Sequence, residues 1–129
     1  MAIFKDTEQM YEVLGNLWQQ LLDDPDNGSK FKGAELKIKY ILSDPAGILW
    51  VTPEGVFTGE QDLKPDVEMA LSGDTAHKFW LKEVSLPAAL AKKLITSKGS
   101  MTKVMKLLPL LKPLHEAYPA VCDKYGLPR

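Results

Sequence analysis

The chain has 129 residues, 45% hydrophobic and 26% charged, which is typical of one globular domain and excludes a disordered or repetitive sequence. Its formal net charge of −1 gives no general basic excess for nucleic acid, and its single cysteine excludes an intramolecular disulfide. We find no secretory leader and no run of about 18 uncharged apolar residues. We therefore expect a single domain over residues 1–129 that stays in the cytoplasm.

The first half of the sequence predicts one helix followed by three strands. Apolar residues from Met10 to Leu22 recur at helical spacing, and Asp6 is placed to cap this helix. The following run DDPDNG combines proline, acids and an Asn-Gly pair, so we expect a loop there. Alternating side chains over 35–42 and the short apolar runs 48–52 and 56–60 predict a three-stranded meander.

A fourth strand is predicted after a crossover rich in polar residues. Residues 67–71 alternate between apolar and other side chains, as in a half-buried strand. The polar positions Asp66 and Glu68 would face Lys37 or Lys39 if these strands pair, because opposite charges across neighbouring strands attract.

Helices are expected on both sides of the last predicted strand, residues 94–97. Asp74 is expected to cap one helix, and Pro87 suits the first turn of a short second helix. After Gly99, the apolar residues of 101–108 follow helical spacing.

The C-terminal region contains three prolines, at positions 109, 113 and 119. Each removes a backbone donor and disfavours helix in the residue before it. We therefore expect short jointed segments there and not one long helix.

Charge is distributed unevenly along the chain. Residues 1–83 carry fifteen acids and eight lysines, a net charge of −7, whereas residues 84–115 carry six lysines and no acid. This acid-free stretch has two interpretations: a solvated lysine face over ordinary core, or a surface for anionic head groups, acidic partners or acyl carriers. The sequence alone leaves both open.

The residues that could carry chemistry are separated from one another in the sequence. His77, His115 and Cys122 have no partners at metal-ligand spacing, so we expect no metal ion and no cofactor. The glycines match no phosphate-binding loop, and no serine lies in a nucleophile motif. His115 and Cys122 make a poor base and nucleophile pair, so we do not expect an enzyme.

Residues 66–114 contain three segments that together resemble one known family. These are the strand DVEMALS, the helix DTAHKFWL and the run KLITSKGSMTKVMKLL, which combines a lysine-rich strand, a glycine turn and a methionine-bearing helix. In sequence and order they resemble the sterol carrier protein 2-like family of lipid-transfer domains. The proline-jointed C-terminus departs from that family, which has one terminal helix.

The resemblance implies an α+β fold with a single mixed five-stranded sheet covered by helices. The expected order is helix, three strands, crossover, strand, helix, strand and helix. It also implies an apolar tunnel between sheet and helices for a fatty acid, fatty acyl-CoA, sterol-like lipid or phospholipid. We therefore expect non-enzymatic lipid binding or transfer, with transient contact with an anionic membrane surface and no nucleic acid partner.

Two sets of site residues follow from this lipid-binding hypothesis. The side chains expected to line the tunnel are Phe79, Trp80, Ile95, Met101, Val104, Met105, Leu108 and Leu111. The side chains expected to meet a head group or a membrane are Lys92, Lys93, Lys98, Lys103 and Lys106.

Two alternatives stay open at this point. The same fold could serve as a regulatory or interaction module with a vestigial pocket, either as a homodimer or docked on an enzyme. A less favoured alternative is an enzyme acting on a lipid or acyl thioester, with His77 or Cys122 in the tunnel.

Overall fold

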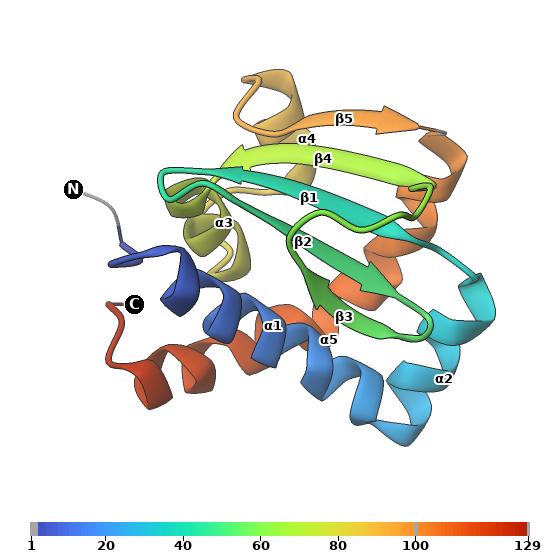
Figure 1. The fold of residues 1–129 in the computed structure, drawn as a ribbon, viewed down its shortest axis with the longest axis horizontal. Coiled ribbons are helices and arrows are strands. Elements are labelled where there is room, and N and C mark those ends of the chain that lie inside the picture. Colours follow the sequence, from blue (N-terminus) through green and yellow to red (C-terminus); the bar gives the residue numbers. More distant parts are fainter. Residues whose placement is uncertain (1–2, 100, 129) are drawn as a thin grey trace.

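The computed structural model describes residues 3–99 and 101–128, which form five strands and five helices (Figure 1). Two helices precede the first three strands, a crossover leads to the fourth strand, and two short helices separate it from the fifth. The elements are α1 (Thr7–Asp23), α2 (Pro25–Ala34), β1 (Ile38–Ser43), β2 (Gly47–Thr52), β3 (Gly55–Thr58), β4 (Val67–Ser72), α3 (Gly73–Trp80), α4 (Leu86–Ala91), β5 (Thr96–Gly99) and α5 (Met101–Tyr125).

The strands form one mixed sheet in the order β3-β2-β1-β4-β5. β1 and β4 run parallel, and the other neighbouring pairs are antiparallel. Parallel strands require a crossover, which the chain makes between β3 and β4. The predicted charge pairing also holds, because Lys39 lies opposite Glu68 in the register of β1 and β4. The expected α+β class with a mixed five-stranded sheet is thus confirmed.

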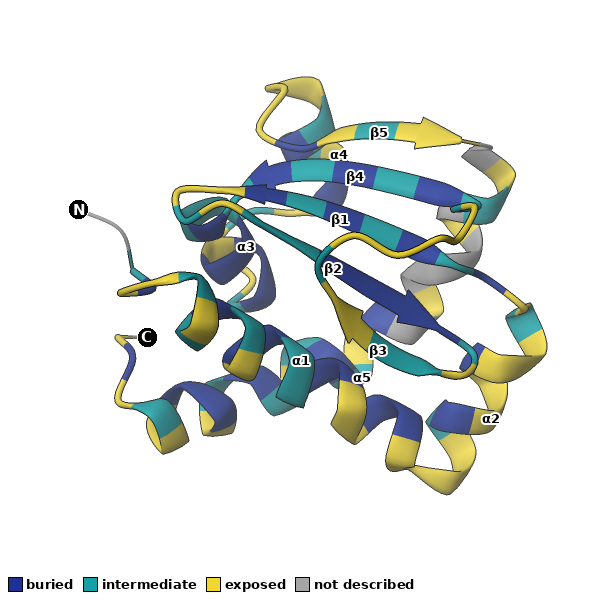
Figure 2. Ribbon diagram, in the orientation of Figure 1, coloured by how far each residue is buried: buried dark blue, intermediate teal, exposed yellow. Residues whose placement is uncertain are grey.

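The two faces of the sheet have different surroundings. On one face, Ile38, Tyr40 and Leu42 of β1 are buried in the core formed with α1, α3, α4 and α5. Figure 2 shows the buried residues along the central strands and in stripes on the helices. The connection between β3 and β4 crosses the opposite face (Figure 1). On that face Lys39 Nζ lies 5.5 Å from the ring centre of Trp50, a cation–π contact.

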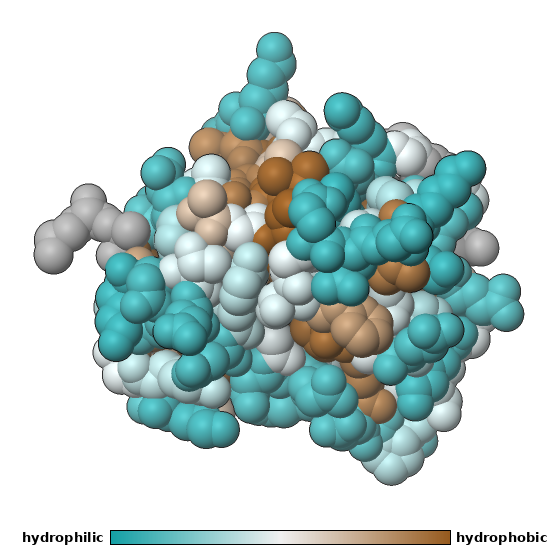
Figure 3. Space-filling model, viewed as in Figure 1, coloured by the Kyte–Doolittle hydropathy of each residue, from teal (hydrophilic) through white to brown (hydrophobic). Residues whose placement is uncertain are grey.

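The face crossed by the β3–β4 connection has a mixed surface. Figure 3 shows hydrophobic areas near its middle, surrounded by hydrophilic side chains. Phe57, which pairs with the buried Trp50 in the register of β2 and β3, is 36% exposed. The helix-covered face therefore holds the main core.

α1 begins as the sequence predicts. Asp6 Oδ1 accepts a hydrogen bond from the backbone N–H of Gln9 at 2.8 Å, and the Gln9 side chain accepts one from the backbone of Lys5. The stripe from Met10 to Leu22 is buried, and α1 packs against α5. None of the described helices is both long enough and apolar enough to cross a membrane.

The prediction of a loop at DDPDNG is wrong, because residues 25–34 form α2. The Asp24 side chain caps this helix by accepting hydrogen bonds from two backbone N–H groups of its first turn. Pro25 occupies that turn, where a backbone N–H has no hydrogen-bond partner within the helix, so the lack of an N–H in proline removes no helical hydrogen bond. Phe31 is fully buried with its ring 5.8 Å from Trp18. This tertiary contact favours helix where the local residues suit either a turn or a helix start.

The expectation of short jointed segments at the C-terminus is also wrong. Pro109, Pro113 and Pro119 all lie within one helix, α5, which follows a curved path behind the sheet and along α1 (Figure 1). Prolines bend a helix and each removes one hydrogen bond, but tertiary packing offsets such losses. Leu114 and Tyr118 are almost fully buried and anchor α5 to the core.

Two smaller differences concern α3 and β5. Ser72 caps α3 in place of Asp74, since Ser72 Oγ accepts from a backbone N–H of the first turn at 3.0 Å. Asp74 instead accepts from the backbone of Ile3 at 2.8 Å and holds the N-terminal segment beside α3. The last strand covers Thr96–Gly99, later than the predicted 94–97.

Candidate functional site

An apolar cavity lies between the sheet and the helices. Strand residues at i and i+2 share a face, so β1 and β4 each contribute two side chains to one wall. Helices α1, α3, α4 and α5 and the segment before β5 supply the opposite wall. The lining residues are Leu14, Trp18, Tyr40, Leu42, Leu49, Met69, Leu71, Ala76, Phe79, Trp80, Leu86, Ile95 and Leu111.

The cavity contains little empty space. The space open to the centre of a water-sized sphere is about 30 Å³, and roughly 10–15 Å³ of such space holds one water molecule. An empty apolar cavity of roughly 400 Å³ would lower the free energy of unfolding by on the order of 10 kcal/mol. When no ligand is bound, the chain is therefore more stable with the cavity walls packed together. An acyl chain fits only if the walls move apart.

Aromatic rings form much of the cavity wall. The rings of Trp18 and Trp80 are 5.9 Å apart and nearly perpendicular, and Phe79 lies 4.8 Å from Trp80. Tyr40 lies 6.1 Å from Trp18, and burial raises the pKa of its hydroxyl well above the ordinary value. The wall is therefore uncharged as well as apolar.

A surface groove lies directly outside the cavity, between the α3–α4 connection and the middle of α5. Its volume by the same measure is about 460 Å³. Phe79, Leu86 and Leu111 line both the groove and the cavity and are only 6–7% exposed. These three side chains, here called the partition, separate the two spaces. The other groove residues are Lys82, Val84, Ser85, Pro87, Lys112 and His115.

His115 lies beside the partition on the groove side. Its ring centre is 5.1 Å from that of Phe79 and 5.4 Å from that of Trp80. Its Nδ1 lies 3.3 Å from the carbonyl oxygen of Trp80, and a carbonyl only accepts, so Nδ1 carries the proton. Burial lowers the pKa of His115 below its usual 6.5, against the opposing effect of the hydrogen bond with Trp80, and the positive charge of Lys82 adds a smaller lowering. The imidazole is therefore neutral at pH 7.

The residues predicted to line a tunnel fall into three groups. Phe79, Trp80, Ile95 and Leu111 lie together in the cavity wall. Met105 is not in that wall, and its side chain is 56% exposed because it lies on the outer side of α5. The side chains of Met101, Val104 and Leu108 lie outside the described residues.

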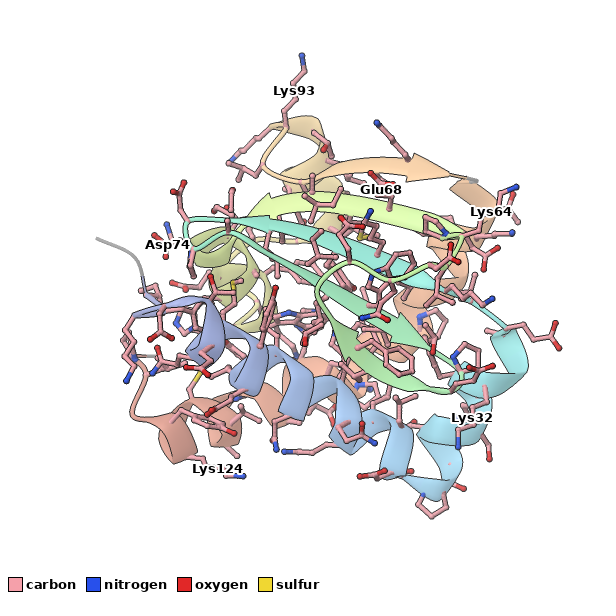
Figure 4. The ribbon with its side chains drawn as sticks, viewed as in Figure 1. Lys32, Lys64, Glu68, Asp74, Lys93 and Lys124 are labelled. Carbon is pink, nitrogen blue, oxygen red and sulfur yellow. The ribbon has the colours of Figure 1, made fainter. Side chains whose placement is uncertain are left out.

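The lysines predicted to meet a head group are dispersed over the surface. Lys92 and Lys93 are exposed at the end of α4, and Figure 4 shows Lys93 pointing away from the fold. Lys98 lies opposite Glu68 in the register of β4 and β5. Lys103 Nζ lies 2.8 Å from an oxygen of Asp66, and the side chain of Lys106 lies outside the described residues.

Sequence reasoning missed most of the cavity wall and both groove lysines, Lys82 and Lys112. Trp18 and Tyr40 were correctly assigned to buried faces by their spacing, but periodicity does not separate a wall residue from ordinary core. Lys82 lies outside the acid-free stretch of residues 84–115. Lys82 lies two residues after the end of α3, so only an accurate prediction of that helix boundary could have indicated its position.

His77 and Cys122 lie away from the cavity and the groove. Among the described residues no group of three His, Cys, Asp or Glu side chains could hold a metal ion. His77 Nδ1 lies 2.8 Å from the Tyr118 hydroxyl, which also hydrogen-bonds the Cys122 side chain. His77 and Cys122 are buried and line neither the cavity nor the groove. The geometry thus offers no support for the enzyme alternative.

Comparisons with solved structures give the same architecture. Sterol carrier protein 2 from Yarrowia lipolytica in its apo form superimposes with a TM-score of 0.67 at 15% identity, covering 87% of this chain and 97% of that one. Sterol carrier protein domain 2 of Helicoverpa armigera gives 0.70 at 17% identity, with coverages of 83% and 88%. Sterol carrier protein 2 from Aedes aegypti, solved with palmitate, gives 0.59 at 10% identity, with coverages of 81% and 92%.

The sequence itself matches no protein-family model and no curated protein. The likeness therefore lies in the arrangement of elements: one mixed five-stranded sheet with helices over one face. The resemblance proposed from residues 66–114 is confirmed at this level. The chain has the fold of the sterol carrier protein 2-like domains.

Proposed function

We propose that this chain binds the hydrocarbon tail of a lipid, a fatty acid or fatty acyl-CoA, in the cavity between sheet and helices and catalyses no reaction. The observation that carries the proposal is the uncharged cavity wall at the interface of the two layers. The palmitate complex of the Aedes aegypti protein supports the same class of ligand in this fold. Transfer between membranes and a cytoplasmic location stay predictions.

Binding by this mechanism depends on the walls moving apart as the tail enters. At about 25 cal/mol per Å², burying roughly 300 Å² of acyl chain contributes about 7 kcal/mol before association losses. The wall includes Met69, whose flexible thioether adapts to ligands of different shape. We therefore expect weak, exchangeable binding across related lipids and not one tight ligand.

The positions of the three tryptophans provide a direct test. Trp18 and Trp80 line the cavity, whereas Trp50 lies on the opposite face of the sheet. A brominated fatty acid quenches a tryptophan that it contacts. We expect quenching in a Trp50→Phe variant, which keeps both cavity tryptophans, and little quenching in a Trp18→Phe/Trp80→Phe variant, which keeps only Trp50.

Two outcomes would contradict the proposal. Equal quenching of both variants would place the fatty acid elsewhere on the surface. No quenching in either variant, with only ligand-free chain in native mass spectrometry and no thermal shift on adding fatty acid, would favour the interaction-module alternative.

A further inference from the structure

The groove outside the cavity combines positive charge with an apolar floor. Its nine lining residues include Lys82, Lys112 and His115 and no acidic residue. Its floor is the partition of Phe79, Leu86 and Leu111, and the cavity begins on the other side. A fatty acid is complementary to this arrangement, because it has an anionic head group and an apolar tail.

Backbone hydrogen bonds hold Lys82 at the rim of the groove. The Lys82 N–H donates to the Phe79 carbonyl at 3.1 Å, and the Glu83 N–H donates to the Lys78 carbonyl at 2.9 Å. These two hydrogen bonds end α3 and hold the base of the Lys82 side chain close to the partition residue Phe79.

The three cationic or titratable residues of the groove lie near one another. Lys112 and His115 are three residues apart on α5, so they share one side of the helix. From the other wall, Lys82 is close enough to His115 for its charge to lower the imidazole pKa. Lys82 and Lys112 therefore line the same groove, whose floor is the partition.

We propose that this groove binds the carboxylate of a fatty acid between Lys82 and Lys112, while the tail passes between Phe79, Leu86 and Leu111 into the cavity. The inference rests on the proposed function and specifies the ligand class and its orientation. It assigns the head group to other lysines than those named from the sequence, of which Lys103 already pairs with Asp66.

The test compares palmitate with 1-hexadecanol, which has the same chain length but no charge. Lys82 and Lys112 are exposed, so each attraction is modest and weakens with salt. We expect the wild-type chain at low salt to bind palmitate about tenfold more tightly than hexadecanol. A Lys82→Glu/Lys112→Glu variant should lose this preference but keep its hexadecanol affinity, which also shows that it is folded.

Matched charge reversals separate a local effect from a change in net charge. A Lys30→Glu/Lys32→Glu variant changes two exposed lysines on α2 by the same total charge and should keep the preference. In the wild-type chain, NMR titration should show the pKa of His115 rising with bound palmitate and unchanged with bound hexadecanol.

The possible failures are distinguishable. If neither palmitate nor hexadecanol binds the wild-type chain, the proposed function fails and this inference with it. If both bind but the Lys82→Glu/Lys112→Glu variant keeps the preference for palmitate, the head group lies elsewhere and lipid binding still stands. Loss of the preference in a Lys92→Glu/Lys93→Glu variant alone would move the head group to the end of α4.

Discussion

The Tyr118 hydroxyl lies 2.8 Å from Nδ1 of His77, inside the core where α5 meets α3. The two rings are 5.5 Å apart and packed edge to face. His77 also hydrogen-bonds the backbone of Pro128. A buried polar contact thus ties α5 and the C-terminal tail to α3, the helix that supplies Phe79 and Trp80 to the cavity wall.

We expect a Tyr118→Phe substitution to lower the free energy of unfolding by about 1–3 kcal/mol, because it leaves a buried imidazole nitrogen without this partner. Urea denaturation at pH 7.5 measures the change. Tyr125→Phe, at a half-buried position near the end of the same helix, is the control and should change stability by about 0.5 kcal/mol or less. Equal losses in the two variants would contradict a stabilising role for the His77 contact.

Stability should fall as the pH drops through the ordinary histidine pKa. Burial lowers the pKa of His77 below its usual 6.5, against smaller opposing effects from Pro128, Glu83 and Asp74. Between pH 6.5 and the lower folded pKa, the unfolded chain binds a proton that the folded chain does not. Stability from the neutral imidazole is therefore complete above about pH 6.5 and is lost below it.

Urea unfolding at several pH values between 5.5 and 7.5 tests this expectation. The slope has a limit of about 1.4 kcal/mol per pH unit for each such histidine. A His77→Gln variant should show a smaller slope than the wild-type chain. A wild-type stability that stays constant, or rises as the pH falls, would contradict the assignment.

Asp66 connects the start of α5 to the sheet. Its Oδ1 lies 2.8 Å from Lys103 Nζ, and its Oδ2 accepts from the backbone N–H of Lys37 at 3.0 Å. The hydrogen bond from Lys103 and then that from Lys37 hold the pKa of Asp66 below its usual 3.8. The contribution of this carboxylate is present above about pH 3.8 and is lost as the pH falls through the lower folded pKa.

We expect Asp66→Asn to reduce the free energy of unfolding by about 1 kcal/mol at pH 7, since the Lys103 pair is partly exposed and screened. The difference from wild type should shrink towards pH 3. Denaturant titrations at both pH values measure it. Asp62→Asn, at an exposed position in the crossover, is the matched control and should have no measurable effect. A similar loss in both variants would show a general charge effect.

Local patterns predict the central strands because β1 and β4 each have one face in the core. In β1 the residues Ile38, Tyr40 and Leu42 are buried, and Lys39 between them lies opposite Glu68. A shift of register by one residue would exchange these faces, so alternation determines which side chains the helices cover. The start of α1 is also predictable from the sequence, because the Asp6 side chain caps the helix.

The elements that could not be predicted depend on distant contacts. DDPDNG suits a turn or a helix start, and the burial of Phe31 against Trp18 favours the helix. The prolines of α5 are tolerated because Leu114 and Tyr118 are packed in the core. The groove needs the α3–α4 connection to lie beside the middle of α5, which no local pattern specifies.

The partition predicts a difference between two buried leucines of α5. Leu111 lies between groove and cavity, whereas Leu114 lines neither of them. Both Leu111→Ala and Leu114→Ala should reduce stability by about 2–5 kcal/mol, because each leaves a cavity in the core. Only Leu111→Ala should also speed the association of palmitate in stopped-flow tryptophan fluorescence, since it removes one of the three side chains that the tail must pass. Equal association rates for the two variants and the wild-type chain would exclude this route to the cavity.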